Sequence, residues 1–196
     1  MLTINVKHNI DAVIRQLDAQ QKQVPYATAR ALTMTAKDVQ RDVTTAIPQL
    51  LDKPTPFTRN AVGITYATKM TLRSRVFIKD IQAKYLGIQI TGGTRLPPKR
   101  ALVVPFNVPV NAYGNLPRGR LRQLLNRKDV FSGRVRGVPG IWQRQRKGGV
   151  KLLIAYEPQA HYQARFPFAQ MARRIVERTL LPNLRRALVD AMRTAR

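Results

Sequence analysis

The sequence predicts an α+β fold. We expect a small, mostly antiparallel sheet flanked by a long helix in the N-terminal half and a long, proline-interrupted C-terminal helix, with extended loops. Two observations carry this prediction. Near both ends of the 196-residue chain, apolar residues recur every three or four positions, which is the period of an amphipathic helix. Between the ends, short alternating runs are separated by Gly and Pro, which is typical of strands and turns.

The first fifty residues predict a short strand and then two helices. Residues 2–6 alternate apolar and polar side chains, as a strand with one buried face does. From about Asn9 the spacing becomes helical, with four apolar residues on one face: Ile10, Val13, Ile14 and Leu17. A polar patch at residues 20–23 then separates this helix from a second one with Pro25 in its first turn.

The second helix has the clearest periodicity in the chain. One stripe contains Leu32, Ala36, Val39, Val43 and either Ala46 or Ile47. Pro48 is expected to end it. The following segment, residues 51–62, contains two prolines and is expected to be extended.

The middle of the chain predicts an antiparallel pair and a buried strand. Alternating runs at residues 64–66 and 72–78 form the pair, with a turn near Thr68 and Lys69. Residues 80–90 are compatible with either a short helix or an irregular strand, and both remain open. Residues 101–106 are apolar enough for a buried strand, and the leucines at positions 121, 124 and 125 indicate one or two turns of helix.

Two further turns and the final helix complete the prediction. We expect a turn at Pro139–Gly140, a hairpin turn at Gly148–Gly149 and a strand at residues 150–156. The last helix begins near Pro167, and Pro182 should kink or divide it. Its expected apolar side consists of Phe168, Met171, Ile175, Leu181, Leu184, Leu188 and Met192. The whole chain, residues 1–196, is predicted to form one domain with a basic, loop-rich insertion at about 92–149.

Positive charge is the strongest functional signal. The chain has 35 Lys and Arg against ten Asp and Glu, a formal net charge of +25. From Arg95 to Lys151 there are fourteen basic residues and one acid, Asp129. Arg outnumbers Lys by 24 to 11, which favours bidentate contacts with phosphate or carboxylate groups. The partners that such a surface predicts are nucleic acid, an anionic membrane or acidic protein subunits.

The residue types needed for catalysis are sparse. There is no cysteine, which excludes disulfides, thiolate zinc ligands and thiol catalysis. The acids are scattered: Asp38 and Asp42 lie one turn apart beside Lys37 and Arg41, as on a solvated helix face with compensated charges. His8 and His161 lack a neighbouring carboxylate motif. We therefore expect no enzyme, no catalytic residue, no metal and no cofactor.

Motifs for sequence-specific binding and for membranes are also missing. No helix-turn-helix spacing, zinc ligand set or RNA-binding strand motif is present. Trp142, close to Arg144 and Arg146, could stack on a base or anchor a core or subunit interface, and both readings remain open. The first residues do not have the pattern of a signal peptide. No run of eighteen apolar residues occurs, so we expect no membrane partner and a place in the cytosol or in an assembled particle.

Three segments resemble one protein family. They are VPYATARALTMTAKDVQRDV (residues 24–43), GVPGIWQRQRKGGVKLLIAY (137–156) and FPFAQMARRIVERTLLPNLRRALVDAMRTAR (166–196). Together they resemble the minor tail protein Z family of tailed phages, which includes the lambda-type tail-completion protein. The shared features are an Ala-rich early helix after a Val-Pro step and a closing Arg-rich helix interrupted by a Leu-Pro step, here Leu181–Pro182.

The resemblance implies a structural protein of the virion tail and neck, assembled in the host cytoplasm. Such a protein completes the head-proximal end of the tail and supports head–tail joining. It implies a homo-oligomeric ring, commonly hexameric, around the DNA path. The implied partners are tail terminator, tail tube, tape-measure or head-connector proteins, and genomic DNA through its phosphates. The alternative is a free, non-sequence-specific nucleic-acid-binding protein, and a nuclease is a third reading that the scattered acids disfavour.

Candidate contact residues follow from the charge. The first group for DNA or acidic partners is Arg118, Arg120, Arg122, Arg134, Arg136, Arg144, Arg146 and Lys147. The second group, on the last helix, is Arg173, Arg174, Arg178, Arg185 and Arg186. For subunit packing we expect the loop zone at 92–120 together with Pro139, Gly140 and Trp142.

Overall fold

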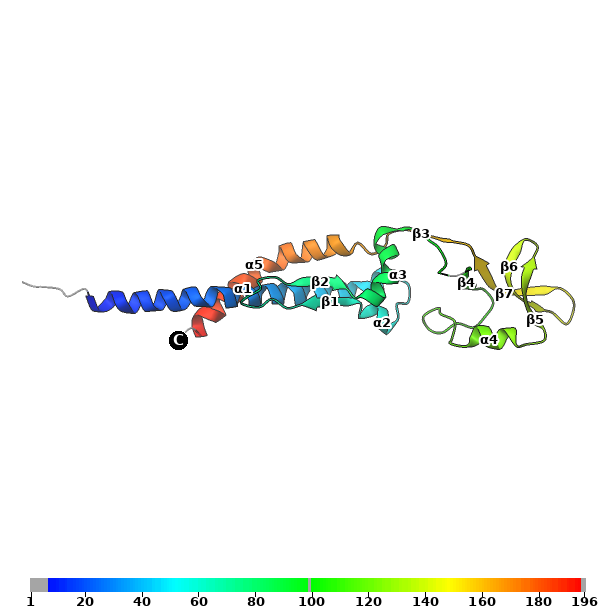
Figure 1. The fold of residues 1–196 in the computed structure, drawn as a ribbon, viewed down its shortest axis with the longest axis horizontal. Helices are drawn as coiled ribbons and strands as arrows, with labels where there is room; N and C mark the ends of the chain where they lie inside the picture. The colour runs from blue at the N-terminus through cyan, green and yellow to red at the C-terminus, as the bar shows by residue number, and fades with distance from the viewer. Residues whose placement is uncertain (1–6, 99, 195–196) are drawn as a thin grey trace, which may run out of the picture. The chain divides into compact units, whose positions relative to one another are not determined.

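The computed structural model describes residues 7–98 and 100–194, with side chains for residues 21, 23–98 and 100–193. The fold is α+β, as the sequence predicts. Figure 1 shows two compact units. The helical unit comprises residues 1–47, 59–82 and 167–196, and the sheet unit comprises residues 48–58 and 83–166. The predicted insertion at about 92–149 lies within the sheet unit, and the strand predicted at residues 2–6 lies outside the described residues.

Helix α1 (Lys7–Leu50) is one helix of 44 residues. The prediction of two helices was therefore wrong, and so was the predicted end at Pro48. The polar patch at 20–23 consists of Gln and Lys, which are good helix formers. Pro25 removes one amide donor but does not oblige the helix to stop, and next to it the Thr28 hydroxyl donates a hydrogen bond to the Val24 carbonyl at 2.8 Å.

Helix α5 (Phe168–Thr194) continues through Pro182 and is not divided. It packs antiparallel to α1 in the helical unit, through a seam of small residues. The buried members of this seam are Ala27, Ala31, Ala187 and Ala191. Leu184 and Leu188 lie only partly buried against it. The predicted apolar side was thus wrong in part, because the alanines face α1 while Leu181 and Met192 are 61% and 49% exposed.

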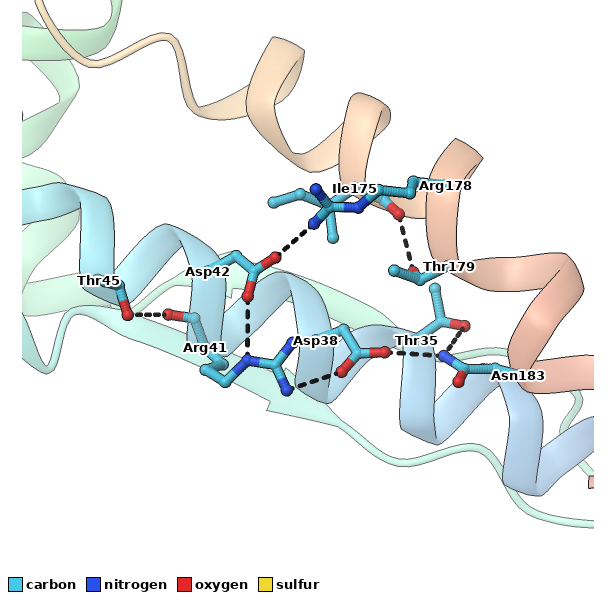
Figure 2. Close-up of polar contacts among 9 residues, drawn as sticks. All are labelled: Thr35, Asp38, Arg41, Asp42, Thr45, Ile175, Arg178, Thr179 and Asn183. Carbon is cyan, nitrogen blue, oxygen red and sulfur yellow. Dashed lines mark hydrogen bonds and ion pairs between the residues drawn. The ribbon is translucent and has the colours of Figure 1, made fainter. Parts of the chain in front are cut away.

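A polar network continues the seam (Figure 2). The Asn183 side-chain amide donates to the Thr35 hydroxyl at 3.2 Å and to the Asp38 carboxylate at 2.8 Å. Arg41 bridges Asp38 and Asp42 at 3.1 and 3.0 Å. Arg178 of α5 donates to the Asp42 carboxylate at 2.8 Å. Both carboxylates therefore contact α5 as well as compensating charge on α1.

A hairpin lies along α1 in the same unit. Strands β1 (Val62–Thr65) and β2 (Arg75–Ile78) pair antiparallel, as predicted. Thr68 and Thr71 exchange backbone hydrogen bonds of 2.9 and 3.1 Å at the connecting turn, which confirms its predicted position. The Gln40 amide of α1 donates to the Val62 carbonyl at 2.9 Å, so the hairpin is tied to the helix.

Two short helices precede the sheet. Helix α2 (Pro56–Arg59) occupies part of the segment expected to be extended, so that prediction was wrong for these residues. The Thr55 hydroxyl accepts a hydrogen bond from the Thr58 amide at 3.2 Å, which is an N-cap contact, and Pro56 then occupies the first helical position that suits proline. Helix α3 (Asp80–Thr91) settles the open alternative for residues 80–90 as a helix.

The sheet unit contains a four-stranded antiparallel sheet in the order β4-β7-β6-β5. Its strands are β4 (Leu102–Pro105), β5 (Val130–Val135), β6 (Val138–Arg144) and β7 (Val150–Glu157). One face is covered by α4 (Arg120–Leu125), whose Leu124 joins a buried core with Ile141 and Ile154. The predicted strand at 101–106 forms β4, but it is an edge strand, and its Val103 and Val104 are 43% and 39% exposed.

A separate pair, β3 (Gly93–Arg95) with β8 (Ala160–Tyr162), completes the sheet unit. Across the described residues of both units, none of the helices has the length and apolar character needed to cross a membrane.

Candidate functional site

The predicted contact residues divide between the two units. Arg118 to Lys147 belong to the sheet unit, whereas the candidate arginines of α5 belong to the helical unit. The sheet unit has seventeen Lys and Arg against three Asp and Glu in its sequence, a formal charge of +14. The helical unit has eighteen against seven, which leaves +11. Each unit therefore carries its own basic surface.

Within the sheet unit, strand β6 separates two basic groups. Arg134 and Arg136 lie at the β5–β6 turn, whereas Arg144, Arg146 and Lys147 lie at the β6–β7 turn. The seven residues of β6 lie between these turns, and at about 3.3 Å per residue they span about 20 Å. The structure therefore places five candidates of the first group in two sets at opposite ends of one strand.

The β5–β6 turn differs from the prediction. It is formed by Arg136 and Gly137, which have φ angles of 49° and 82°, as in a two-residue hairpin with both central residues left-handed. Pro139 and Gly140 instead lie inside β6. Glycine is required at position 140 because the backbone of β7 lies close to it, not because the chain turns there. A Cβ at this position would overlap the carbonyl oxygen of Ile154.

The β6–β7 turn confirms the prediction of a hairpin at Gly148–Gly149, both of which have positive φ. Residues 127 and 128 lie at the same end of the sheet, because Val130 pairs with Gln143. We call this group the basic end of the sheet and define it as Arg127, Lys128, Arg144, Arg146 and Lys147. All five are exposed.

Asp129 organises the basic end. Its carboxylate accepts two hydrogen bonds from Arg127, at 3.1 and 2.6 Å, and one from the Gln143 side chain at 2.8 Å. The hydrogen bonds from Arg127 are the largest cause that lowers the pKa of Asp129 to about 2, followed by the bond from Gln143. The Asp129 backbone carbonyl also accepts from the Arg144 amide at 2.7 Å. The single acid of the 95–151 stretch is therefore a positioning residue for its neighbours, and the Arg-x-Asp spacing was the sequence signal for it.

Arg144 is held in a defined orientation. Its guanidinium carbon lies 4.6 Å from the centroid of the Phe131 ring, within the range of a cation–π contact. One guanidinium nitrogen also approaches the Lys128 carbonyl at 3.5 Å. A stacked guanidinium keeps its edge available for an oxygen ligand. Arg144 is therefore oriented to bind an anion through that edge.

Trp142 is an internal residue of the sheet unit. It lies opposite Phe131 in β5 and Leu152 in β7, and it is 9% exposed. Its indole nitrogen is the buried side-chain polar atom without a hydrogen-bond partner among the described residues. This burial favours the core alternative for Trp142 over base stacking. Pro139 is half-buried and Gly140 is buried.

The remaining candidate arginines differ in their exposure and in whether they pair with a carboxylate of the chain. In the sheet unit, Arg118 and Arg122 are exposed and Arg120 is half-buried. On α5, Arg178 donates to Asp42 at 2.8 Å, so part of its hydrogen-bonding capacity is used inside the helical unit. The other α5 candidates are exposed, namely Arg173, Arg174, Arg185 and Arg186.

The histidines and acids outside these surfaces are the candidates for a metal site in the described part of the chain. No three His, Asp or Glu residues come together there as metal ligands would. His161 lies 2.9 Å from the Thr94 hydroxyl through Nδ1 and 3.3 Å from the Gln159 amide through Nε2, so both ring nitrogens have polar neighbours. The side chain of His8 lies outside the described residues.

No protein-family model, curated protein or solved structure matches the chain.

Proposed function

We propose that the chain is a structural subunit of a phage tail that completes the head-proximal end of the tail and supports head–tail joining. Its basic surfaces contact DNA phosphates or acidic surfaces of neighbouring tail and neck proteins, and several copies form a ring, of which a hexamer is one form, around the DNA path. The observation that carries this proposal is the exposure of cations without internal neutralisation. Of the described cations in the sheet unit, only Arg127 is in an ion pair with a carboxylate.

The physical reason is the cost of uncompensated charge. A unit with +14 repels itself unless counter-ions or a partner neutralise it. The basic end of the sheet and the β5–β6 turn present their cations outwards at two places rather than around one cavity. Such an arrangement suits an extended anionic surface better than a small ligand, and phosphate contacts of this kind carry no sequence information.

The resemblance supplies the particular setting. The three segments that resemble the minor tail protein Z family fall on α1, on the β6–β7 hairpin and on α5. These elements include the core of the helical unit and the basic end of the sheet. Ring formation, the tail partners and the place in the virion are proposed on that resemblance.

Charge reversal at the basic end tests the proposal. In the variant R144E/R146E/K147E, three cations become anions on exposed side chains, so the subunit should fold while head–tail joining falls at least tenfold. Joining is measured by counting complete particles and separate heads and tails by electron microscopy, in an infection supplied with the variant in place of the normal protein.

The matched control is K69E/R73E/R75E, which makes the same charge change on exposed positions in and beside the β1–β2 hairpin. It should join heads and tails normally. Equal numbers of complete particles from both variants would contradict the role of the basic end. Salt-sensitive binding of duplex DNA by the isolated protein, with no association with particles, would favour the free nucleic-acid-binding alternative.

A further inference from the structure

Helix α5 has an apolar stripe that α1 does not cover. Leu181, Val189 and Met192 are 61%, 55% and 49% exposed. At 3.6 residues per turn these positions fall within about 80° of one another. They lie away from the alanine seam, which packs on α1. Exposed apolar residues that gather on one helix face indicate a protein contact more strongly than isolated ones do.

Helix α1 extends beyond the helix against which it packs. Thr35 contacts Asn183, Arg30 pairs with Asp190, and the two helices run in opposite directions. This register brings Thr194, the last described residue of α5, level with about Tyr26. The backbone of α1 from Lys7 to about Pro25 therefore continues past the described end of α5, as Figure 1 shows. These nineteen residues are about 28 Å of helix.

The extending segment has an amphipathic sequence. Ile10, Val13, Ile14 and Leu17 recur at steps of three, one and three, which places them on one face of a helix. Two of the chain's ten acids, Asp11 and Asp18, are seven residues apart, at the edge of that face. The stripe on α5 has cations instead, because Arg185 lies between its apolar positions and Arg193 follows Met192.

We infer that residues 10–18 of α1 in one copy of the chain pack on the stripe of α5 in a second copy. Within a chain, the stripe lies on the side of α5 opposite the alanine seam, so it is turned away from α1. In the sequence, both rows are apolar, and acids flank the row on α1 whereas arginines flank the row on α5, so the two rows are complementary in charge. The contact joins two different surfaces, so it is heterologous and extends from copy to copy until a ring closes. It deepens the proposed function by naming a subunit contact, and it rests on that proposal only for its biological setting.

Two variants separate the two faces. L181Q/M192Q removes apolar area from the stripe at exposed positions, and I10Q/I14Q does so on α1. Sedimentation equilibrium of the purified chain, without DNA or particles, should show wild-type association beyond the 22.2 kDa monomer. Each variant alone should associate at least tenfold more weakly. V176Q, at a 36% exposed position on another side of α5, should associate as the wild type does.

Mixing the two variants gives the decisive result. Each retains the face that the other has lost, so an equimolar mixture should form a dimer of about 44 kDa, twice the monomer mass, through one intact contact. A monomeric wild type at 100 µM, unchanged association of either variant, or a mixture that stays monomeric would overturn the inference.

A charge exchange keeps the test valid if a glutamine variant unfolds. D11R/D18R and R185E/R193E should each weaken association, and the chain with all four substitutions should recover it. Failure of the combined variant to recover would likewise overturn the inference. Because none of these measurements uses particles, their outcome is independent of the head–tail joining experiment.

Discussion

Asn183 of α5 donates its side-chain amide to the carboxylate of Asp38 on α1 over 2.8 Å, and the same nitrogen reaches the Thr35 hydroxyl. Asn183 is 6% exposed. The contact continues the seam whose buried residues are alanines, and alanine side chains make no directional contacts. A buried polar contact of this kind can fix which turn of one helix lies opposite which turn of the other.

Replacing Asn183 should therefore lower stability more than its size suggests. N183A removes two hydrogen bonds and leaves the buried hydroxyl of Thr35 and the partly buried carboxylate of Asp38 with fewer donors. We expect the free energy of unfolding to fall by about 2–3 kcal/mol, measured by urea denaturation. R30A, which removes the more exposed ion pair with Asp190, should change it by less than about 1 kcal/mol. Equal effects of the two substitutions would contradict the role of the network.

The alanine seam should tolerate no larger side chain. Ala187 is 0% exposed, so A187L forces additional carbon atoms between α1 and α5. Overpacking of this kind costs about 1–3 kcal/mol, and we expect thermal unfolding to show the corresponding loss. V189L, two positions along at a 55% exposed site, is the control and should be nearly neutral.

Gly140 and Gly133 face each other across β5 and β6 but should respond differently to alanine. A Cβ at Gly140 meets the backbone carbonyl of Ile154, which cannot rotate away. A Cβ at Gly133 meets the Phe131 ring at 3.5 Å, an ordinary contact. We expect G140A to lower the unfolding free energy by at least about 2 kcal/mol and G133A to lower it much less. Similar losses in urea denaturation would show that close approach is not what Gly140 provides.

The carboxyl group of Asp129 should titrate at about pH 2 in the folded chain, below its ordinary pKa of 3.8. Because the folded pKa is lowered, the contribution of the Arg127 contact to stability is fully present above about pH 4. It is lost as the pH falls from about 4 to about 2. NMR titration of the carboxyl carbon gives the midpoint directly.

The control is R127Q, which removes the largest cause of the shift, so the pKa of Asp129 should rise toward 3.8. A midpoint near 3.8 in the unaltered chain would contradict the described geometry of the basic end.

The sequence predicted the fold class and most elements because their signals are local. The β1–β2 pair, the hairpin turn at Gly148–Gly149 and α4 all follow from alternation, glycine and leucine spacing over fewer than twenty residues. The prediction of two helices before Pro48 was wrong because the polar patch at residues 20–23 interrupts the apolar spacing but consists of residues that favour helix.

The packing between distant elements was less predictable. Hydropathy favours leucine over alanine for an inward face, but the buried residues where α1 and α5 meet are alanines. The turn at Arg136–Gly137 was missed because arginine rarely adopts a positive φ, and Pro139–Gly140 has the stronger turn composition. At the candidate site, composition was enough to identify the cations. Their separation into two groups at the two ends of β6 depends on strand register, which composition does not determine.

The division into units has a consequence for biosynthesis. The helical unit is discontinuous, because α1 is made first while its partner residues on α5 are among the last of the chain. At about 5–20 residues per second, a ribosome needs about 7–28 s to proceed from Leu50 to Asp190. During this interval the nascent α1 has neither Asn183 nor the alanines of α5, whereas the sheet unit is complete once residue 166 has emerged. The order of synthesis therefore favours folding of the inserted unit before the unit that surrounds it in sequence.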